Sequence, residues 1–138
     1  MNRVAIIGSG LIGTSLGLAL RRSPDRFEVT AWDASQSALA VCQARGGCNR
    51  SASSLRDAVR DADVVVLAAP LDAILVLMQE LTTHLNPSTL VTDVAGVKVP
   101  PVETARLLQE LSGPVFMLII GAAFRPDGPG SFDLFIAA

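Results

Sequence analysis

Three glycines near the N-terminus are the residues whose spacing points most clearly to a chemical role. They follow the apolar run Val-Ala-Ile-Ile and precede an apolar segment with helical periodicity. A strand, a G-x-G-x-x-G turn and a helix in this order are typical of dinucleotide-binding sites. Gly8 would let the chain turn off the strand, Gly10 would let a pyrophosphate approach the backbone, and Gly13 would let the helix pack against the strand. The helix N-terminus would direct its free N–H groups at the phosphates. A glycine-rich turn with no ligand is the alternative. The predicted cofactor contacts of this turn are Gly8, Ser9, Gly10, Leu11, Ile12 and Gly13.

A carboxylate at the end of the second apolar run is placed to recognise a ribose. Asp33 stands twenty residues after Gly13 and directly follows the run Glu28 to Trp32. A carboxylate at this distance from the glycine turn can accept hydrogen bonds from the adenosine ribose hydroxyls and repels the additional phosphate of NADP. No arginine follows directly to hold that phosphate, so the sequence favours NAD. The alternative role of Asp33 is that of a turn residue or helix N-cap.

Two further segments are expected at the same cofactor crevice. Ala68-Ala69-Pro70 follow the fourth apolar run, where small residues would let the backbone approach the nicotinamide ring. A plain strand-to-helix turn, with proline near the helix start, explains this segment nearly as well. Asp93 ends the fifth apolar run and could cap the next loop by accepting hydrogen bonds from backbone N–H groups. The predicted cofactor-binding residues beyond the glycine turn are Asp33, Ala68, Ala69, Pro70 and Asp93.

Candidate substrate contacts lie in the loops after the fifth and sixth apolar runs. Lys98, close to Gly96, could bind a substrate carboxylate or could be an ordinary solvated lysine. Arg125 and Asp127 lie in a Gly- and Pro-rich stretch that is expected on the same side. His84, the single histidine, falls at the end of a helix leading away from the crevice, where dipole complementarity explains it. We assign no catalytic residue and no metal ligand, and the expected substrate contacts are Gly96, Lys98 and Arg125.

Alternating strand and helix patterns must position these residues. Six expected strands cover about Arg3–Ile7, Glu28–Trp32, Cys48–Ala52, Val64–Ala68, Thr89–Val94 and Val115–Ile120. The expected helices begin near Leu11, Ser35, Ser54, Pro70 and Pro100, and a short last strand covers Leu134–Ala138. In the first helix, which is expected to end near Arg22, the apolar periodicity predicts a shared face of Leu11, Ile12, Ser15, Leu16, Ala19 and Leu20. The pattern predicts a doubly wound parallel sheet in the order 3-2-1-4-5-6, covered by helices on both faces in three layers.

Composition limits the classes of protein that the chain can belong to. The 138 residues form one expected domain, 1–138, with 50% hydrophobic and 17% charged residues. The net charge of −2 and the absence of tyrosine argue against a nucleic-acid partner.

No apolar run reaches the roughly 18 residues of a membrane helix, and we expect no signal peptide. Cys42 and Cys48 are expected to be free thiols in a reducing cytoplasm. The high apolar fraction would also suit a homodimer formed through an apolar surface.

Four segments resemble a known enzyme family. The successive sequences GSGLIGTSLGLAL, AWDAS, VVVLAAP and VTDVAGVK are similar to the cofactor-binding domain of prephenate dehydrogenases and their arogenate-using relatives. VTDVAGVKVPPVETA is the most specific piece, and the resemblance covers about residues 3 to 120. It implies a Rossmann domain followed by a helical dimerisation domain. It also implies oxidative decarboxylation in tyrosine biosynthesis, in which NAD or NADP takes a hydride from the hydroxyl-bearing ring carbon and a histidine helps to remove the hydroxyl proton.

The chain departs from this family in three places. Gly96 stands where the family usually has a serine before Val-Lys. Residues 121–126 read Gly-Ala-Ala-Phe-Arg-Pro where the family has a Gly-x-His-Pro-Met-type motif with the catalytic histidine. We also expect the helical second domain to be missing from this chain. Without a general base, proton removal would slow by about 10²–10⁴-fold. We therefore expect cofactor binding to survive better than turnover.

Three functions are compatible with these observations. The first is the NAD-binding domain of a prephenate or arogenate dehydrogenase, truncated and weakly active or inactive alone. The second is a stand-alone NAD-binding or sensing module without chemistry. The third is another small-substrate NAD-dependent dehydrogenase with a similar first domain. The segment Thr92 to Lys98 favours the first over the third, and the missing histidine keeps the second open.

Overall fold

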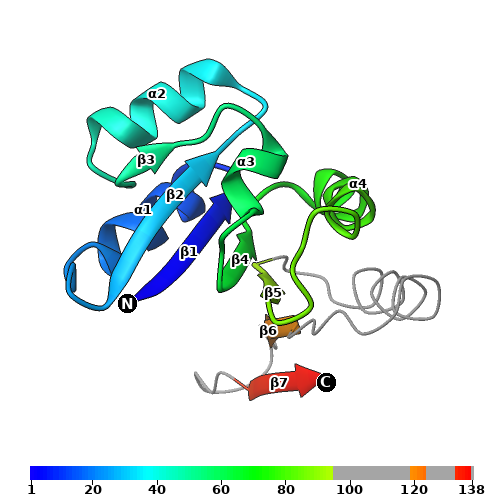
Figure 1. Ribbon diagram of the computed structural model, residues 1–138. Helices are drawn as coiled ribbons and strands as arrows, with labels where there is room; N and C mark the ends of the chain where they lie inside the picture. The colour runs from blue at the N-terminus through cyan, green and yellow to red at the C-terminus, as the bar shows by residue number, and fades with distance from the viewer. Residues whose placement is uncertain (95–118, 124–132, 138) are drawn as a thin grey trace.

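A five-stranded parallel sheet forms the centre of the fold (Figure 1). The computed structural model describes residues 1–94 with their side chains and residues 119–123 and 133–137 as backbone. The strands of the main sheet are β1 (Asn2–Ile7), β2 (Phe27–Trp32), β3 (Arg50–Ser51), β4 (Val64–Leu67) and β5 (Leu90–Asp93). They are ordered β3-β2-β1-β4-β5 and all pair in parallel. This order confirms the predicted doubly wound arrangement for the five strands.

Helices cover both faces of the sheet. They are α1 (Leu11–Leu20), α2 (Gln36–Ala44), α3 (Leu55–Val59) and α4 (Leu71–Leu81). Side chains of β1 alternate between the faces: Val4 and Ile6 pack with α1 and α2, whereas Ala5 and Ile7 pack with α3 and α4. A strand buried on both faces must be apolar at every position, as the run Val4 to Ile7 is. The result is the three-layer architecture that the sequence predicts.

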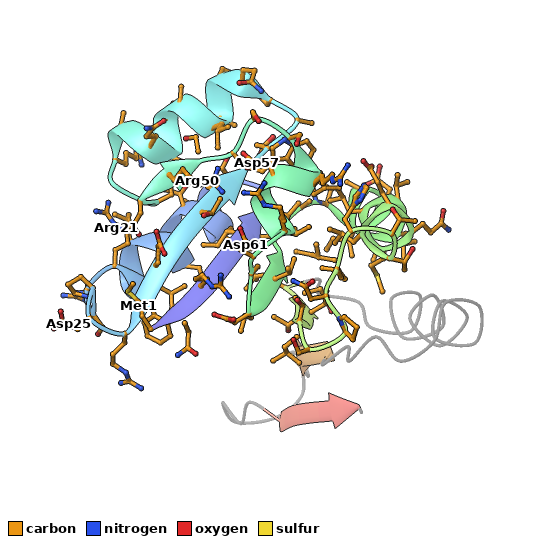
Figure 2. All side chains as sticks on the ribbon, in the orientation of Figure 1. Met1, Arg21, Asp25, Arg50, Asp57 and Asp61 are labelled. Atoms are coloured by element: carbon orange, nitrogen blue, oxygen red, sulfur yellow. The ribbon has the colours of Figure 1, made fainter. Side chains whose placement is uncertain are left out.

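Local sequence signals explain where the helices begin. The Ser35 hydroxyl accepts a hydrogen bond from the Ala38 N–H at 3.3 Å, and the Ser54 hydroxyl accepts one from the Asp57 N–H at 3.1 Å. Both serines satisfy N–H groups that have no partner within the helix. Asp57 also binds Arg50 of β3, 2.8 Å between Oδ2 and Nη1 (Figure 2). The helix starts that the sequence predicts near Ser35 and Ser54 are therefore confirmed.

The buried face of α1 differs from the predicted one. Gly13, Thr14 and Gly17 face the interior, whereas Leu11, Ile12 and Leu18 are exposed. A methyl group on Gly17 would overlap the carbonyl oxygen of Gly47, next to the end of α2. Leu16 and Leu20 of the predicted face do pack against the core, whereas Leu11, Ile12, Ser15 and Ala19 do not. Close backbone packing on two glycines thus decides the orientation of this helix, and the predicted face was correct only in part.

The last two described strands lie outside the five-stranded sheet. The strands β6 (Ile119–Ala123) and β7 (Asp133–Ala137) pair with each other in antiparallel fashion. The sequence predicted a strand over Val115–Ile120 as the sixth member of the parallel sheet. The nine residues 124–132 between β6 and β7 are fewer than a parallel crossover needs, which explains the antiparallel pairing. The helix expected from Pro100 lies outside the described residues.

Candidate functional site

The turn after β1 holds two of its three motif glycines in tight contact with backbone. Gly8 has a φ of +103°, which L-residues with a side chain rarely adopt. A Cβ on Gly8 would also overlap the carbonyl oxygen of Ala68. A Cβ on Gly13 would overlap the carbonyl oxygen of Gly8 and lie 3.2 Å from Cγ2 of Ile6. These contacts bring α1 close to β1 and to the end of β4, as the motif predicts.

Gly10 has the opposite surroundings, because its missing side chain leaves open space. No atom lies within 4 Å of the position that a Cβ would occupy. The residue precedes the first turn of α1, and its carbonyl accepts the Thr14 N–H at 2.9 Å. The first N–H groups of a helix have no intrahelical partner. The space before Gly10 therefore suits an anionic group that approaches the backbone at the positive end of α1.

Asp33 links this turn to the start of α2. Its Oδ2 accepts the Ser9 N–H at 2.7 Å and the Ser9 hydroxyl at 3.1 Å. Its Oδ1 accepts the Ser35 N–H at 2.7 Å, so the residue also forms an Asx turn. Ser35, not Asp33, is the N-cap of α2. Because each carboxylate oxygen can accept two hydrogen bonds, Oδ1 keeps capacity for a further donor such as a ribose hydroxyl.

A crevice of about 640 Å³ opens beside these residues at the carboxyl ends of β1, β2 and β4. Its volume lies in the range of small-molecule and cofactor sites. Ligands of open parallel sheets bind at this edge, where the strand order reverses between β1 and β4. The crevice is lined by Ile7, Gly8, Gly10, Trp32, Asp33, Ala34, Ser35, Ala68, Ala69, Pro70, Asp72, Ala73, Val76 and Leu77.

The predicted small residues after β4 form one wall of the crevice. The Ala68 N–H donates to the Ile7 carbonyl at 2.7 Å, which continues the β1–β4 ladder by one residue. Pro70 is the N-cap residue of α4. Asp93 is 4% exposed and lies across from Leu67 at the end of β5. The structure thus brings the residues after β4 next to the glycine turn and places Asp93 in the interior.

Sequence reasoning missed the apolar wall of the crevice. Trp32, Ala73, Val76 and Leu77 face the same hollow as Asp33. Val76 is 63% exposed, although it belongs to a helix whose buried residues are Ile74, Met78 and Leu81. The sequence signal that could have found Val76 is its position as an apolar residue outside the buried stripe of an amphipathic helix. These side chains give the crevice an apolar surface that suits an aromatic base.

The remaining candidates do not add to the site in the described part of the chain. Gly96, Lys98, Arg125 and Asp127 lie outside the described residues. His84 follows the end of α4, and the helical rise places it about 20 Å from Pro70. Among the described residues, no three His, Cys, Asp or Glu side chains gather as metal ligands. No helix in residues 1–94 is long and apolar enough to cross a membrane.

Comparisons with known proteins agree with this geometry. The sequence model described as "prephenate dehydrogenase, nucleotide-binding domain" matches residues 16–115. Prephenate dehydrogenase of Lactococcus lactis subsp. cremoris (strain MG1363) is 31% identical over 109 residues, which are 78% of this chain and 30% of the relative. The chain thus spans about a third of the length of this curated relative.

Solved structures show the same fold. Synechocystis arogenate dehydrogenase superposes with a TM-score of 0.74 at 29% identity, over 87% of this chain and 40% of that one. Prephenate dehydrogenase from A. aeolicus, described in complex with hydroxyphenyl propionate and NAD+, gives a TM-score of 0.73 at 22% identity, over 88% and 42%. The family match covers most of the chain, and the glycine turn, the strand order and the crevice are those of a nucleotide-binding domain. The chain belongs to the family of prephenate dehydrogenase nucleotide-binding domains.

Proposed function

We propose that the crevice between the glycine turn and α4 binds NAD, and that the domain serves a prephenate or arogenate dehydrogenase. The open space at Gly10 is the observation that carries the NAD site, since a pyrophosphate needs a backbone without a side chain at the start of α1. The A. aeolicus protein of the same fold is described with NAD+. The fold of the A. aeolicus protein and the geometry of this crevice support NAD as the cofactor of this chain.

The charge of the crevice favours NAD over NADP. Among the described residues that line it, Asp33 and Asp72 are the charged ones, and none is a lysine or an arginine. A 2′-phosphate on the adenosine ribose would therefore meet negative charge without a compensating cation. A ribose 2′-hydroxyl could instead donate to Oδ1 of Asp33, which has one acceptor position left after binding the Ser35 N–H.

The apolar residues of the crevice would hold the adenine. Trp32 lies at the end of β2, and Ala73 and Val76 lie on the facing side of α4. Aromatic and aliphatic side chains on both sides of a slot bury the two faces of a planar base, and they require no charge on that base. The adenosine half of the dinucleotide would therefore lie over β2 and the pyrophosphate at Gly10.

The reaction would be the oxidative decarboxylation of prephenate or arogenate in tyrosine biosynthesis. NAD supplies a hydride acceptor when it is bound. The described residues of this chain would bind and orient the cofactor, whereas Gly96, Lys98 and Arg125 are proposed substrate contacts. We propose that the chain alone is weakly active or inactive, because its single histidine follows the end of α4, about 20 Å from Pro70 by the helical rise.

The position of His84 also supports a second function, a binding module that holds NAD without turning over a substrate. The two functions share the cofactor site and differ in the presence of a general base near the nicotinamide. Product formation therefore separates them, whereas binding alone does not.

Fluorescence of Trp32 provides a direct test. The chain has one tryptophan and no tyrosine, and that tryptophan lines the crevice. Titration with NADH should quench its emission by energy transfer, and the dissociation constant should be about tenfold or more below that of NADPH. Equal affinity, or a preference for NADPH, would contradict the NAD assignment.

In a second assay, prephenate or arogenate with NAD should yield little NADH. Rapid turnover would show that another residue replaces the histidine.

A further inference from the structure

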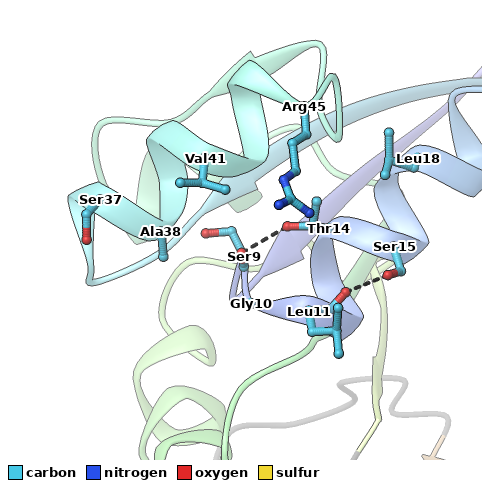
Figure 3. Close-up of a pocket in the computed structure, with 10 residues that line it drawn as sticks. All are labelled: Ser9, Gly10, Leu11, Thr14, Ser15, Leu18, Ser37, Ala38, Val41 and Arg45. Carbon is cyan, nitrogen blue, oxygen red and sulfur yellow. Dashed lines mark hydrogen bonds between the residues drawn. The ribbon is translucent and has the colours of Figure 1, made fainter.

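A second hollow lies between α1 and α2, apart from the cofactor crevice (Figure 3). Its volume is about 460 Å³, which is within the range of small-molecule sites. Gly10 borders both hollows, and most of the lining of this one comes from the facing sides of the two helices. We call it the α1–α2 groove; its lining residues are Ser9, Gly10, Leu11, Thr14, Ser15, Leu18, Ser37, Ala38, Val41 and Arg45.

Exposed apolar side chains from both helices line part of the groove. Leu11, Leu18 and Val41 are 83%, 41% and 52% exposed. Leu11 and Leu18 are seven residues apart, so they lie about two turns apart on the same side of α1. They face solvent because Gly13 and Gly17 occupy the interior side of this helix. The close packing that builds the glycine turn therefore also leaves an apolar strip along the groove.

Within the part of the chain that the structure describes, Arg45 is the single charged residue that lines the groove. Its side chain extends from the end of α2 towards Thr14 on α1 (Figure 3). Its guanidinium has no ion pair or hydrogen bond within residues 1–94 of the structure. An arginine with several unused N–H donors beside apolar side chains is suited to an acidic group.

The hydroxyl groups of the groove strengthen this assignment. Thr14 donates its proton to the Ser9 carbonyl at 2.9 Å, Ser15 donates to the Leu11 carbonyl at 2.7 Å, and the Ser9 hydroxyl donates to Asp33. A hydroxyl has one proton, so these three can only accept a further hydrogen bond. The Ser37 hydroxyl shares a hydrogen bond of 3.0 Å with that of Ser35, in which either can donate. Arg45 is therefore the charged donor that an anion in the groove could use, beside the free backbone N–H groups at the start of α1.

We propose that the α1–α2 groove binds a small amphipathic anion, a molecule with an apolar body and one acidic group. The apolar body would cover Leu11, Leu18 and Val41, and the acidic group would bind the guanidinium of Arg45. Residues 11–22 and 35–45 contain three arginines and no Asp or Glu. A second copy of the chain seated on this face would bring these positive charges together without an acidic partner. The proposal does not depend on the identity of the cofactor or on turnover.

Binding of 8-anilinonaphthalene-1-sulfonate to the full chain tests the proposal, since this dye combines an apolar body with one acidic group and fluoresces when buried. Arg45→Gln should raise the dissociation constant of this dye about fivefold to tenfold, because the substitution removes one charge-assisted hydrogen bond. Arg22→Gln, which removes a charge at the end of α1 outside the groove, should leave the constant unchanged. The neutral dye N-phenyl-1-naphthylamine should bind the wild type and Arg45→Gln alike.

Three results would overturn the proposal. The first is an equal effect of Arg45→Gln and Arg22→Gln on the anionic dye. The second is wild-type affinity for the anionic dye in Val41→Asp, which places a negative charge in the groove. The third is a dimer in light scattering whose formation displaces the dye, because a second copy would then cover the groove. Circular dichroism of each variant shows whether the fold is intact, so that a loss of binding is not a loss of structure.

Discussion

The Ser9 backbone N–H donates to Oδ2 of Asp33 at 2.7 Å, across the turn that follows β1. The carboxylate that we predict to recognise the ribose therefore also holds the glycine turn in place. The Ser9 hydroxyl adds a second hydrogen bond to the same oxygen. One side chain thus connects the phosphate and ribose parts of the proposed cofactor site. Asp33 therefore holds the glycine turn in place even when no ligand is bound.

Asp33→Asn separates the two roles of this residue. Asparagine keeps one oxygen that can accept a hydrogen bond, but it loses the negative charge and one acceptor. We expect the dissociation constant for NADH to rise about tenfold, which corresponds to about 1.4 kcal/mol, and the preference over NADPH to narrow. Titrations followed by Trp32 fluorescence measure both constants. Asp72→Asn, which removes the other charge that lines the crevice, is the matched control. An unchanged ratio of the two constants in Asp33→Asn would refute the role in cofactor choice.

Gly10→Val should abolish NADH binding and leave the domain folded. The backbone of Gly10 has a φ of −70° and a ψ of −160°, which valine adopts readily, and its side chain would enter open space. The cost at a helix N-cap is at most about 1 kcal/mol. The valine side chain would occupy the proposed pyrophosphate position. Urea denaturation reports the stability, and fluorescence titration reports the affinity; wild-type affinity would mean that the phosphates bind elsewhere.

Gly13→Ala should instead destabilise the fold. Its methyl group would overlap the backbone carbonyl oxygen of Gly8 and crowd Ile6, and backbone cannot move aside as a flexible side chain can. Overpacking of this kind costs about 2 kcal/mol. Urea denaturation of Gly13→Ala beside Gly10→Ala makes the comparison, because the second methyl group enters open space. Similar stabilities for the two variants would show that α1 is not held by close contact at Gly13.

Asp57→Asn should weaken the start of α3 in a pH-dependent way. Oδ2 of Asp57 accepts the Ser53 N–H at 3.0 Å and an Arg50 N–H at 2.8 Å. These contacts, first that with Ser53 and then that with Arg50, lower the pKa of Asp57. The stability that they contribute is therefore complete above the ordinary carboxyl pKa of about 3.9 and is lost as the pH falls through the lower folded-state value.

At neutral pH we expect Asp57→Asn to lower the free energy of unfolding by about 1 kcal/mol. The difference from wild type should shrink at a pH below the folded-state pKa of Asp57. Asp61→Asn is the matched control, since Asp61 pairs only with its exposed neighbour Arg60 within residues 1–94. That control should change stability by less than about 0.5 kcal/mol. A pH-independent difference for Asp57→Asn would rule out the charge as its cause.

Much of the fold could be predicted from the sequence because its signals are local. The apolar run Val64 to Leu67 predicts a strand buried on both faces, and Ser35 and Ser54 predict helix starts through their hydroxyl groups. The alternation of strands and helices then predicts a parallel sheet with short connections. The strand order of the main sheet follows from these elements together with the glycine motif.

The candidate site was predicted only in part. Gly8, Gly10, Asp33 and the residues after β4 do border one crevice, because the carboxyl ends of parallel strands share one edge. Trp32 and Val76 were missed, since their roles depend on how α4 faces β2 across the sheet. That orientation arises from packing between segments far apart in the sequence.

The sequence by itself determined where the chain turns, which segments are buried on both faces, and where a dinucleotide could approach the backbone. These properties depend on residue type at neighbouring positions, such as a glycine where φ is +103° at Gly8. The tertiary structure decided which face of α1 is buried and that Asp33 holds Ser9. Those outcomes depend on the contact of Gly17 with Gly47 and on the pairing of β1 with β2, which no local pattern encodes.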